Sequence, residues 1–276
     1  FVSPFVYAGL VERLTSGRCL TGFTGLLQQL TPPELPWASL YWLFAAILIV
    51  VIAVVLVVRF PRLELQDDER SGSLRSYKVL LGNKYVYLFF FGMLAYTASE
   101  QGVANWISEF LRSYHGLDPQ GVGAPVVGRF WGYMSVGCLV GLAALKLWNW
   151  RTVLKVSGVL AVTSLLLALF GSAGVAVQAF PAVGFSISVM FSIVMSTGLN
   201  SVDRYHGSLA GILCTGIAGG ALGPLVVGWL GDLAGLRIAL LFVCLTIAYI
   251  VSIAFWARPL VENKCVRLSE LFKSAE

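Results

Sequence analysis

Apolar residues fill the chain in stretches of about twenty, and short segments between these stretches carry most of the charge. An α-helix needs roughly twenty residues, at about 1.5 Å each, to cross the roughly 30 Å hydrocarbon core of a bilayer. Seven stretches of suitable length lie near residues 37–58, 85–111, 126–148, 152–171, 180–200, 208–230 and 236–256. The pattern predicts an all-α membrane protein, a bundle with about seven transmembrane helices.

The segments between the apolar stretches divide the chain further. We expect residues 1–36 to hold the end of a preceding helix and an exofacial loop, followed by a single helix over 37–58. A charged linker over 59–84 leads into six helices over 85–256, and residues 257–276 form a tail. A charged linker followed by six helices is the arrangement at the middle of a twelve-helix transporter. The six helices would then be its C-terminal half.

A half of this kind is expected to contain two three-helix units related as inverted repeats. On this interpretation the first unit covers residues 85–171 and the second covers residues 180–256. The helix over 37–58 would be the last helix of the N-terminal half, which is the expected partner of the C-terminal half.

The composition excludes a soluble globular protein. Hydrophobic residues make up 58% of the chain and charged residues 12%, against roughly 25% charge in a typical soluble domain. The net charge of +5 does not indicate nucleic-acid binding, because the basic residues lie in short segments between apolar stretches. Residues so placed meet lipid headgroups, so the bilayer is the expected partner and nucleic acid is not.

Lys and Arg residues are divided unevenly between the two sides of the predicted bundle. Most of the 19 basic residues fall in the linker over 59–84, in the tail over 257–276 and in two connections on the same side. Basic residues are retained on the cytoplasmic side of membrane proteins. We therefore predict that 11–36 and 112–125 are exofacial in a multi-pass protein of a cell membrane, either a bacterial inner membrane or a eukaryotic plasma membrane.

One acidic residue lies deep in a predicted span. Glu100 is far from both ends of the stretch over 85–111, where an ionisable group is costly and usually faces a cavity or a partner. Helical spacing places Tyr96 on the face of Glu100, and Gln101 and Asn105 on the adjoining row. The alternative is that these residues do no more than hydrogen-bond neighbouring helices. Neutral side chains such as Gln and Asn would be enough for that packing, so the presence of an acidic residue favours ligand binding. We therefore predict that the four residues bind a substrate.

A second polar stripe consists of serines spaced by four residues. Ser188, Ser192, Ser196 and Asn200 recur on one face of the stretch over 180–200. Hydroxyl groups on one face can hydrogen-bond a polar ligand, and small serine side chains also let helices approach closely. Both interpretations remain open, and Ser192 and Ser196 are the candidate substrate-binding residues of this stripe.

Two further groups of residues have a gating or structural interpretation. Arg129 lies near the outer end of its span, at about the depth of Glu109 on the preceding span. We interpret these two residues as an ion pair or an outer gate contact. Gly219, Gly220 and Pro224 belong to a glycine-rich span, in which missing side chains permit close backbone contact in lipid. We predict that they form a packing and bending element.

The sequence offers no catalytic, metal-binding or cofactor-binding motif. His115 and His206 fall in predicted loops, and neither H-E-x-x-H nor a G-x-S-x-G elbow occurs. The glycine-rich span lacks the Lys-Ser or Lys-Thr of a phosphate loop. Three of the five cysteines lie inside apolar stretches. We therefore expect no enzyme activity, no cofactor, no metal site and no disulfide.

Three segments resemble the fucose:proton symporter family of the major facilitator superfamily. They read YTASEQGVANWISEF, GRFWGYMSVGCLVG and HGSLAGILCTGIAGGALGPLVVGWLGD. Tyr96, Glu100 and Trp106 match a Tyr-x-x-x-Glu phrase and the following Trp of the family's seventh helix. The Gly-Gly-x-x-x-Pro phrase of its eleventh helix is matched by Gly219, Gly220 and Pro224.

One position departs from the family pattern. Trp131 and Gly132 match a Trp-Gly phrase of the eighth helix, but Cys138 stands where the family usually has Arg. The resemblance implies a twelve-helix major facilitator fold, alternating access and symport of a hexose-like sugar with a proton, or with sodium as in some relatives. The departure at Cys138 leaves two alternatives open, a permease for another small polar solute or a membrane sensor on the same fold that does not transport.

Overall fold

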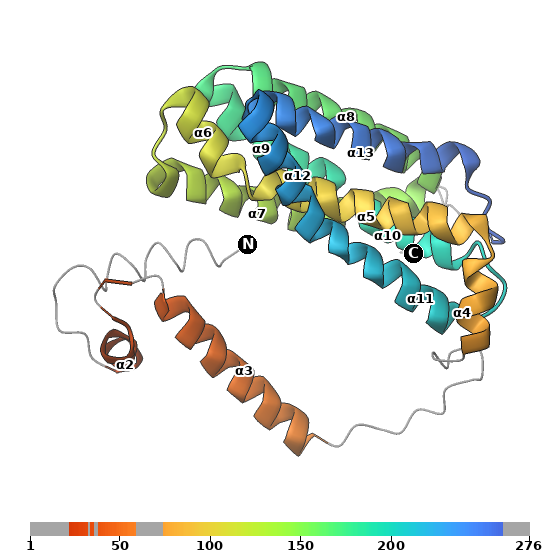
Figure 1. Ribbon diagram of the computed structural model, residues 1–276, viewed down its shortest axis with the longest axis horizontal. Coiled ribbons are helices and arrows are strands. Elements are labelled where there is room, and N and C mark those ends of the chain that lie inside the picture. Colours follow the sequence, from red (N-terminus) through yellow and green to blue (C-terminus); the bar gives the residue numbers. More distant parts are fainter. Residues whose placement is uncertain (1–21, 33, 36–37, 59–73, 262–276) are drawn as a thin grey trace, which may run out of the picture. The chain divides into compact units, whose positions relative to one another are not determined.

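The computed structural model describes residues 22–32, 34–35, 38–58 and 74–261, and the regular elements within these residues are helices (Figure 1). The chain forms two compact units, one containing α2 and α3 and the other containing the helices from α4 onward. Most of the predicted 59–84 linker and the ends of the chain, including Cys19 and Cys265, lie outside the described residues.

The smaller unit contains one long apolar helix. α2 (Phe23–Leu30) packs against α3 (Ser39–Val57). α3 carries no charged residue, and most of its large apolar side chains are exposed. A helix that is apolar on all sides without being buried in protein is suited to lipid.

The larger unit begins with a short amphipathic helix and continues as a helical bundle. Its elements are α4 (Leu74–Leu81), α5 (Lys84–Ala104), α6 (Ile107–His115), η2 (Pro119–Gly123), α7 (Ala124–Leu147), α8 (Trp150–Phe170), α9 (Ala173–Ile187), α10 (Met190–Leu199), α11 (His206–Thr215), η3 (Gly216–Ala218), α12 (Gly219–Ala234) and α13 (Leu236–Trp256). Figure 1 shows α8 and α13 side by side along one edge of this unit, with α7 and α11 along the opposite edge.

Six helical stretches in the described part of the chain are long and apolar enough to cross a membrane. They are Ser39–Val57, Pro119–Leu147, Trp150–Phe170, Ala173–Leu199, His206–Ala234 and Leu236–Trp256. The seventh predicted span corresponds to α5 and α6, whose polar stripe lowers the mean hydropathy. α5 nevertheless packs inside the bundle against α12 and α13. The chain is a multi-pass membrane protein.

The predicted span over 85–111 is interrupted between α5 and α6. The Trp106 N–H donates to the Val103 carbonyl three residues back, at 3.1 Å, instead of four residues back. The Asn105 side chain donates to the Gln101 main-chain carbonyl at 2.9 Å. Both bonds compete with regular α-helical bonding. The span over 180–200 is also interrupted, between α9 and α10 at Ser188 and Val189.

The helix pairings repeat within the bundle. α5 packs against α12 and α13, α9 packs against α7 and α8, and α8 packs against α13. The first unit consists of α5–α6, α7 and α8, and the second of α9–α10, α11–α12 and α13. If each span is replaced by its counterpart in the other unit, the same set of helix pairs is obtained. Each unit crosses the membrane three times, which is an odd number, so the second unit starts on the side opposite to the first. This is the pairing pattern of inverted repeats.

Glycines bring α12 into backbone contact with α5. A Cβ atom at Gly219 would collide with the Leu94 carbonyl oxygen, and one at Gly223 would collide with the Ala98 carbonyl oxygen. Gly220 is half-buried, and a Cβ there would lie 3.2 Å from the Gln101 Cγ. The close crossing brings Gln101 of the α5 polar stripe next to α12.

Candidate functional site

The polar residues of α5 form a chain of hydrogen bonds. The Asn105 side-chain amide donates to the Gln101 Oε1 at 3.2 Å, and the Gln101 Nε2 donates to the Glu100 Oε1 at 3.1 Å. Glu100 and Gln101 are half-buried, and Asn105 is exposed. A carboxylate can accept about four hydrogen bonds, so Glu100 keeps acceptor capacity for a ligand.

Tyr96 connects this hydrogen-bonded group to α10. The Tyr96 hydroxyl interacts with the Glu100 carboxylate. Its ring meets the ring of Phe191 on α10 edge-on, with the centroids 5.5 Å apart. Tyr96 itself is only 3% exposed. The structure therefore places the α5 stripe beside Phe191 of α10.

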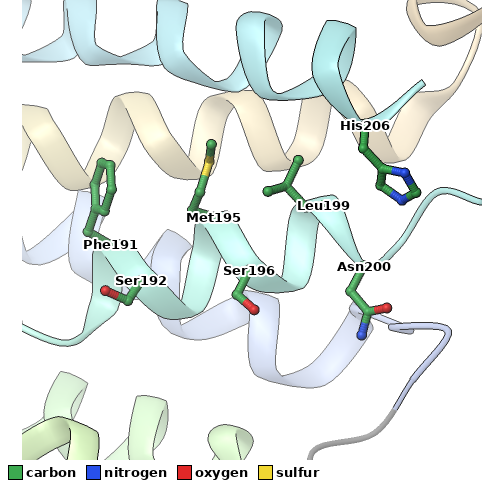
Figure 2. Close-up of a pocket in the computed structure, with 7 residues that line it drawn as sticks. All are labelled: Phe191, Ser192, Met195, Ser196, Leu199, Asn200 and His206. Carbon is green, nitrogen blue, oxygen red and sulfur yellow. The ribbon is translucent and has the colours of Figure 1, made fainter. Parts of the chain in front are cut away.

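A cavity of about 520 Å³ lies along α10 (Figure 2), within the usual range of about 300 to 1,000 Å³ for ligand pockets. We call it the serine cavity, and its lining residues are Phe191, Ser192, Met195, Ser196, Leu199, Asn200 and His206. Figure 2 shows Ser192, Ser196 and Asn200 on one side of α10 and Phe191, Met195 and Leu199 on the other. Ser192 and Ser196 are exposed.

Only part of the predicted serine stripe is open to a ligand. Ser188 is 4% exposed, and its hydroxyl donates to the Phe185 carbonyl at 2.7 Å. The Asn200 amide donates to the Val261 carbonyl at 2.6 Å, beyond the end of α13. Both residues are therefore engaged in the structure of the half, which leaves Ser192 and Ser196 as the hydroxyl groups that face the cavity.

The serine cavity is lined by residues of the serine stripe and by none of the α5 stripe. Glu100, Gln101 and Asn105 are absent from the lining of the serine cavity. The two regions are connected by the ring contact between Tyr96 and Phe191, since Phe191 lines the cavity. Sequence periodicity predicted each stripe but not this connection.

Glu109 has a different partner from the one considered in the sequence analysis. Its carboxylate accepts two hydrogen bonds from Arg112, at 2.8 and 3.0 Å, and one from Ser113 at 2.7 Å. Arg112 lies three residues further along α6, on the same helix face, which favours this pair. No ion pair joins Arg129 to an acidic residue within the described residues. The gate contact of Arg129 stays a prediction.

The Trp106 side chain links the break after α5 to α12 by a hydrogen bond. Its indole N–H donates to the Pro224 carbonyl at 3.0 Å, and a Cβ at Gly228 would lie 2.8 Å from the indole ring. Proline inside a helix removes one N–H donor and bends the backbone. The Pro224 carbonyl thus accepts the Trp106 hydrogen bond at the proline of α12, and Trp106 itself lies at the break after α5. The sequence pattern did not predict this bond.

The described residues contain no group of His, Cys, Asp and Glu side chains that could hold a metal ion. Cys138, Cys214 and Cys244 are free thiols. His115 ends α6 and His206 begins α11. The chemistry available in this part of the chain is hydrogen bonding by hydroxyl, amide and carboxylate groups beside aromatic rings.

No model of a known protein family matches the chain. The chain is 27% identical, over 215 residues, to the glucose/galactose transporter of two Brucella abortus strains. The match covers 76% of this chain and 51% of the relative. The chain thus spans about half the length of the curated relatives it matches. These relatives are transporters.

Two solved structures share the fold. The crystal structure of a variant of the E. coli fucose:proton symporter has a TM-score of 0.67 at 18% identity, covering 91% of this chain and 65% of that one. A major facilitator superfamily transporter, FucP, in the outward conformation has a TM-score of 0.65 at 18% identity, covering 89% of this chain and 62% of that one. The chain therefore has the helical-bundle fold of the major facilitator superfamily.

Proposed function

We propose that the chain is the C-terminal half, and slightly more, of a secondary active transporter that carries a hexose-like sugar together with a cation by alternating access. The observation that carries this proposal is the serine cavity beside the polar stripe of α5, in a bundle of major facilitator fold. The names of the relatives, a glucose/galactose transporter and a fucose:proton symporter, support sugar as the substrate class.

The interrupted helices support a binding site in this region. In transporters built from repeats, substrate sites are typically formed by discontinuous helices at corresponding positions of the repeats. α5–α6 and α9–α10 are the first spans of the two three-helix units, and both are interrupted. Their polar residues, Glu100 on α5 and Ser192 and Ser196 on α10, lie on either side of the ring contact between Tyr96 and Phe191.

The proposed site matches the chemistry of a sugar. Sugar hydroxyl groups both donate and accept hydrogen bonds, so a carboxylate, two amides and two hydroxyls are suitable partners. In our proposal Glu100 accepts from the sugar, Gln101 and Asn105 orient that carboxylate, and Ser192 and Ser196 bind other hydroxyls. Aromatic rings of a pocket supply the apolar surface that a sugar ring face can contact.

The coupling cation is a proton or sodium in this proposal. The resemblance to the symporter family implies that most coupling acids belong to the N-terminal half, so the fragment is not expected to transport alone. We further propose that the protein is not an enzyme, because the polar residues of the proposed site, in the part of the chain that the structure describes, include no nucleophile arranged beside a base.

Counterflow in liposomes tests the proposed function. The full-length protein is reconstituted with a high internal concentration of glucose, galactose or fucose, and uptake of the labelled sugar is measured. Transient accumulation of one sugar is expected, and Ser192→Ala and Ser196→Ala should each weaken its apparent affinity about fivefold, as for one average hydrogen bond. Saturable binding without counterflow would indicate the sensor alternative, and neither binding nor flux of any of these sugars would indicate another solute.

A further inference from the structure

A short segment after α13 returns to the bundle. Residues Ala257–Val261, which we call the C-terminal strap, follow the last turn of α13. Ala257 is fully buried, and its carbonyl accepts a hydrogen bond of 2.7 Å from the Arg151 guanidinium at the start of α8. The strap is thus fixed at its first residue to the helix that packs beside α13.

The far end of the strap is held by Asn200. The Asn200 side-chain amide donates to the Val261 carbonyl at 2.6 Å, and the Leu260 N–H donates to the Asn200 carbonyl at 2.7 Å. Asn200 ends α10, where main-chain carbonyls lack helical partners. The Leu260 and Val261 side chains are 62% and 66% exposed. The far end of the strap is therefore held by its two hydrogen bonds to Asn200 and not by burial of Leu260 and Val261, whereas its first residue is held by burial and by Arg151.

The strap also forms the wall of a second cavity. This cavity has a volume of about 330 Å³ and is lined by Leu145, Trp150, Ser192, Ile193, Ser196, Thr197, Asn200, Pro259 and Val261. It shares Ser192, Ser196 and Asn200 with the serine cavity. Pro259 and Val261 thus stand at the end of the bundle where α10 and α13 finish, next to the two serines proposed to bind a sugar.

We propose that the C-terminal strap is a gate that narrows the second cavity beside Ser196, and that Asn200 is the positioning residue that holds the strap in place. Release of the strap breaks two hydrogen bonds that water can replace, and it removes Pro259 and Val261 from beside Ser196. Asn200 is well suited to this task because it lines both cavities and binds the strap with its side chain and its main chain. The inference rests on the proposed function for the solute that passes the gate.

The test measures access to Ser196 in the full-length protein. Ser196→Cys is introduced, and its modification rate by a membrane-impermeant maleimide is followed in sealed vesicles of both orientations. All native cysteines are first replaced by serine, including Cys19, Cys138, Cys214, Cys244 and Cys265 of this sequence. Adding Asn200→Ala should speed modification from the strap side about fivefold, the equilibrium shift that corresponds to one average hydrogen bond.

Two further variants separate gating from general loosening. Lys146→Ala removes an exposed side chain at the end of α7 and none of the strap's hydrogen bonds, so the modification rate should not change. A chain that ends at Ala257 lacks both hydrogen bonds to Asn200 and the wall residues Pro259 and Val261, so its increase should be at least as large as that of Asn200→Ala. Adding Asn200→Ala to the shortened chain should give no further increase, because the Val261 carbonyl that the Asn200 side chain binds is already absent.

Several outcomes would overturn the proposal. They are an unchanged rate in both Asn200→Ala and the shortened chain, a lower thermal unfolding temperature without faster modification, and an equal increase in Lys146→Ala. Faster modification in a protein that moves no sugar would support the gate and contradict the transport proposal. Sugar flux with an unchanged modification rate would support the transport proposal and contradict the gate.

Discussion

Replacing Glu100 tests the central element of the proposed site. Its carboxylate is half-buried, accepts a hydrogen bond from Gln101 at 3.1 Å and interacts with the Tyr96 hydroxyl. Glu100→Ala removes the carboxylate, so the Gln101 amide and the Tyr96 hydroxyl lose this partner. A hydrogen bond to a charged group contributes about 1.5 to 3 kcal/mol. Loss of one such bond to the sugar should therefore weaken binding about tenfold to 150-fold.

The variant Glu100→Gln separates charge from shape. Its amide oxygen still accepts a hydrogen bond, but that bond is neutral and is worth about 1 kcal/mol. The change from a charged to a neutral bond therefore loses about 0.5 to 2 kcal/mol, so binding should weaken only about twofold to thirtyfold.

Binding is measured by titration calorimetry on the purified full-length protein, with the sugar that shows counterflow. Asp203→Asn serves as the matched control, because Asp203 is a carboxylate with a side chain 78% exposed in the connection between α10 and α11. Its affinity should equal that of the unmodified protein. An affinity in Glu100→Ala within about twofold of the control would refute the assignment, because that difference is smaller than one hydrogen bond provides.

Three further predictions concern packing and orientation. Gly219→Leu should reduce the amount of folded protein, measured by detergent-stable gel filtration, because overpacking costs about 1 to 3 kcal/mol or more; Ala221→Leu, on an exposed face of α12, should not. Trp106→Phe removes the hydrogen bond to α12 and should lower the thermal unfolding temperature by a few degrees; an unchanged temperature would show that the bond contributes nothing. An impermeant maleimide should label Cys19 but not Cys265 in intact cells, and the opposite labelling would reverse the predicted orientation.

Local pattern alone accounts for several features of the structure. Apolar stretches of membrane-spanning length are visible in the sequence because each residue's hydropathy acts locally, whichever helix it later meets. The position of Glu100 within its span and the four-residue spacing of the serines follow from helical periodicity in the same way. Gly219 was predicted to permit close packing, and the structure places it against α5.

The tertiary structure decided which of these polar groups meet and which are already occupied. The contact between Tyr96 and Phe191 joins residues 95 positions apart, a pairing that periodicity does not encode. Asn200 belongs to the serine stripe by spacing, yet it is bound by the strap 61 residues further along the chain. Periodicity specifies which face of a helix is polar, whereas the identity of the facing partner depends on how distant helices pack.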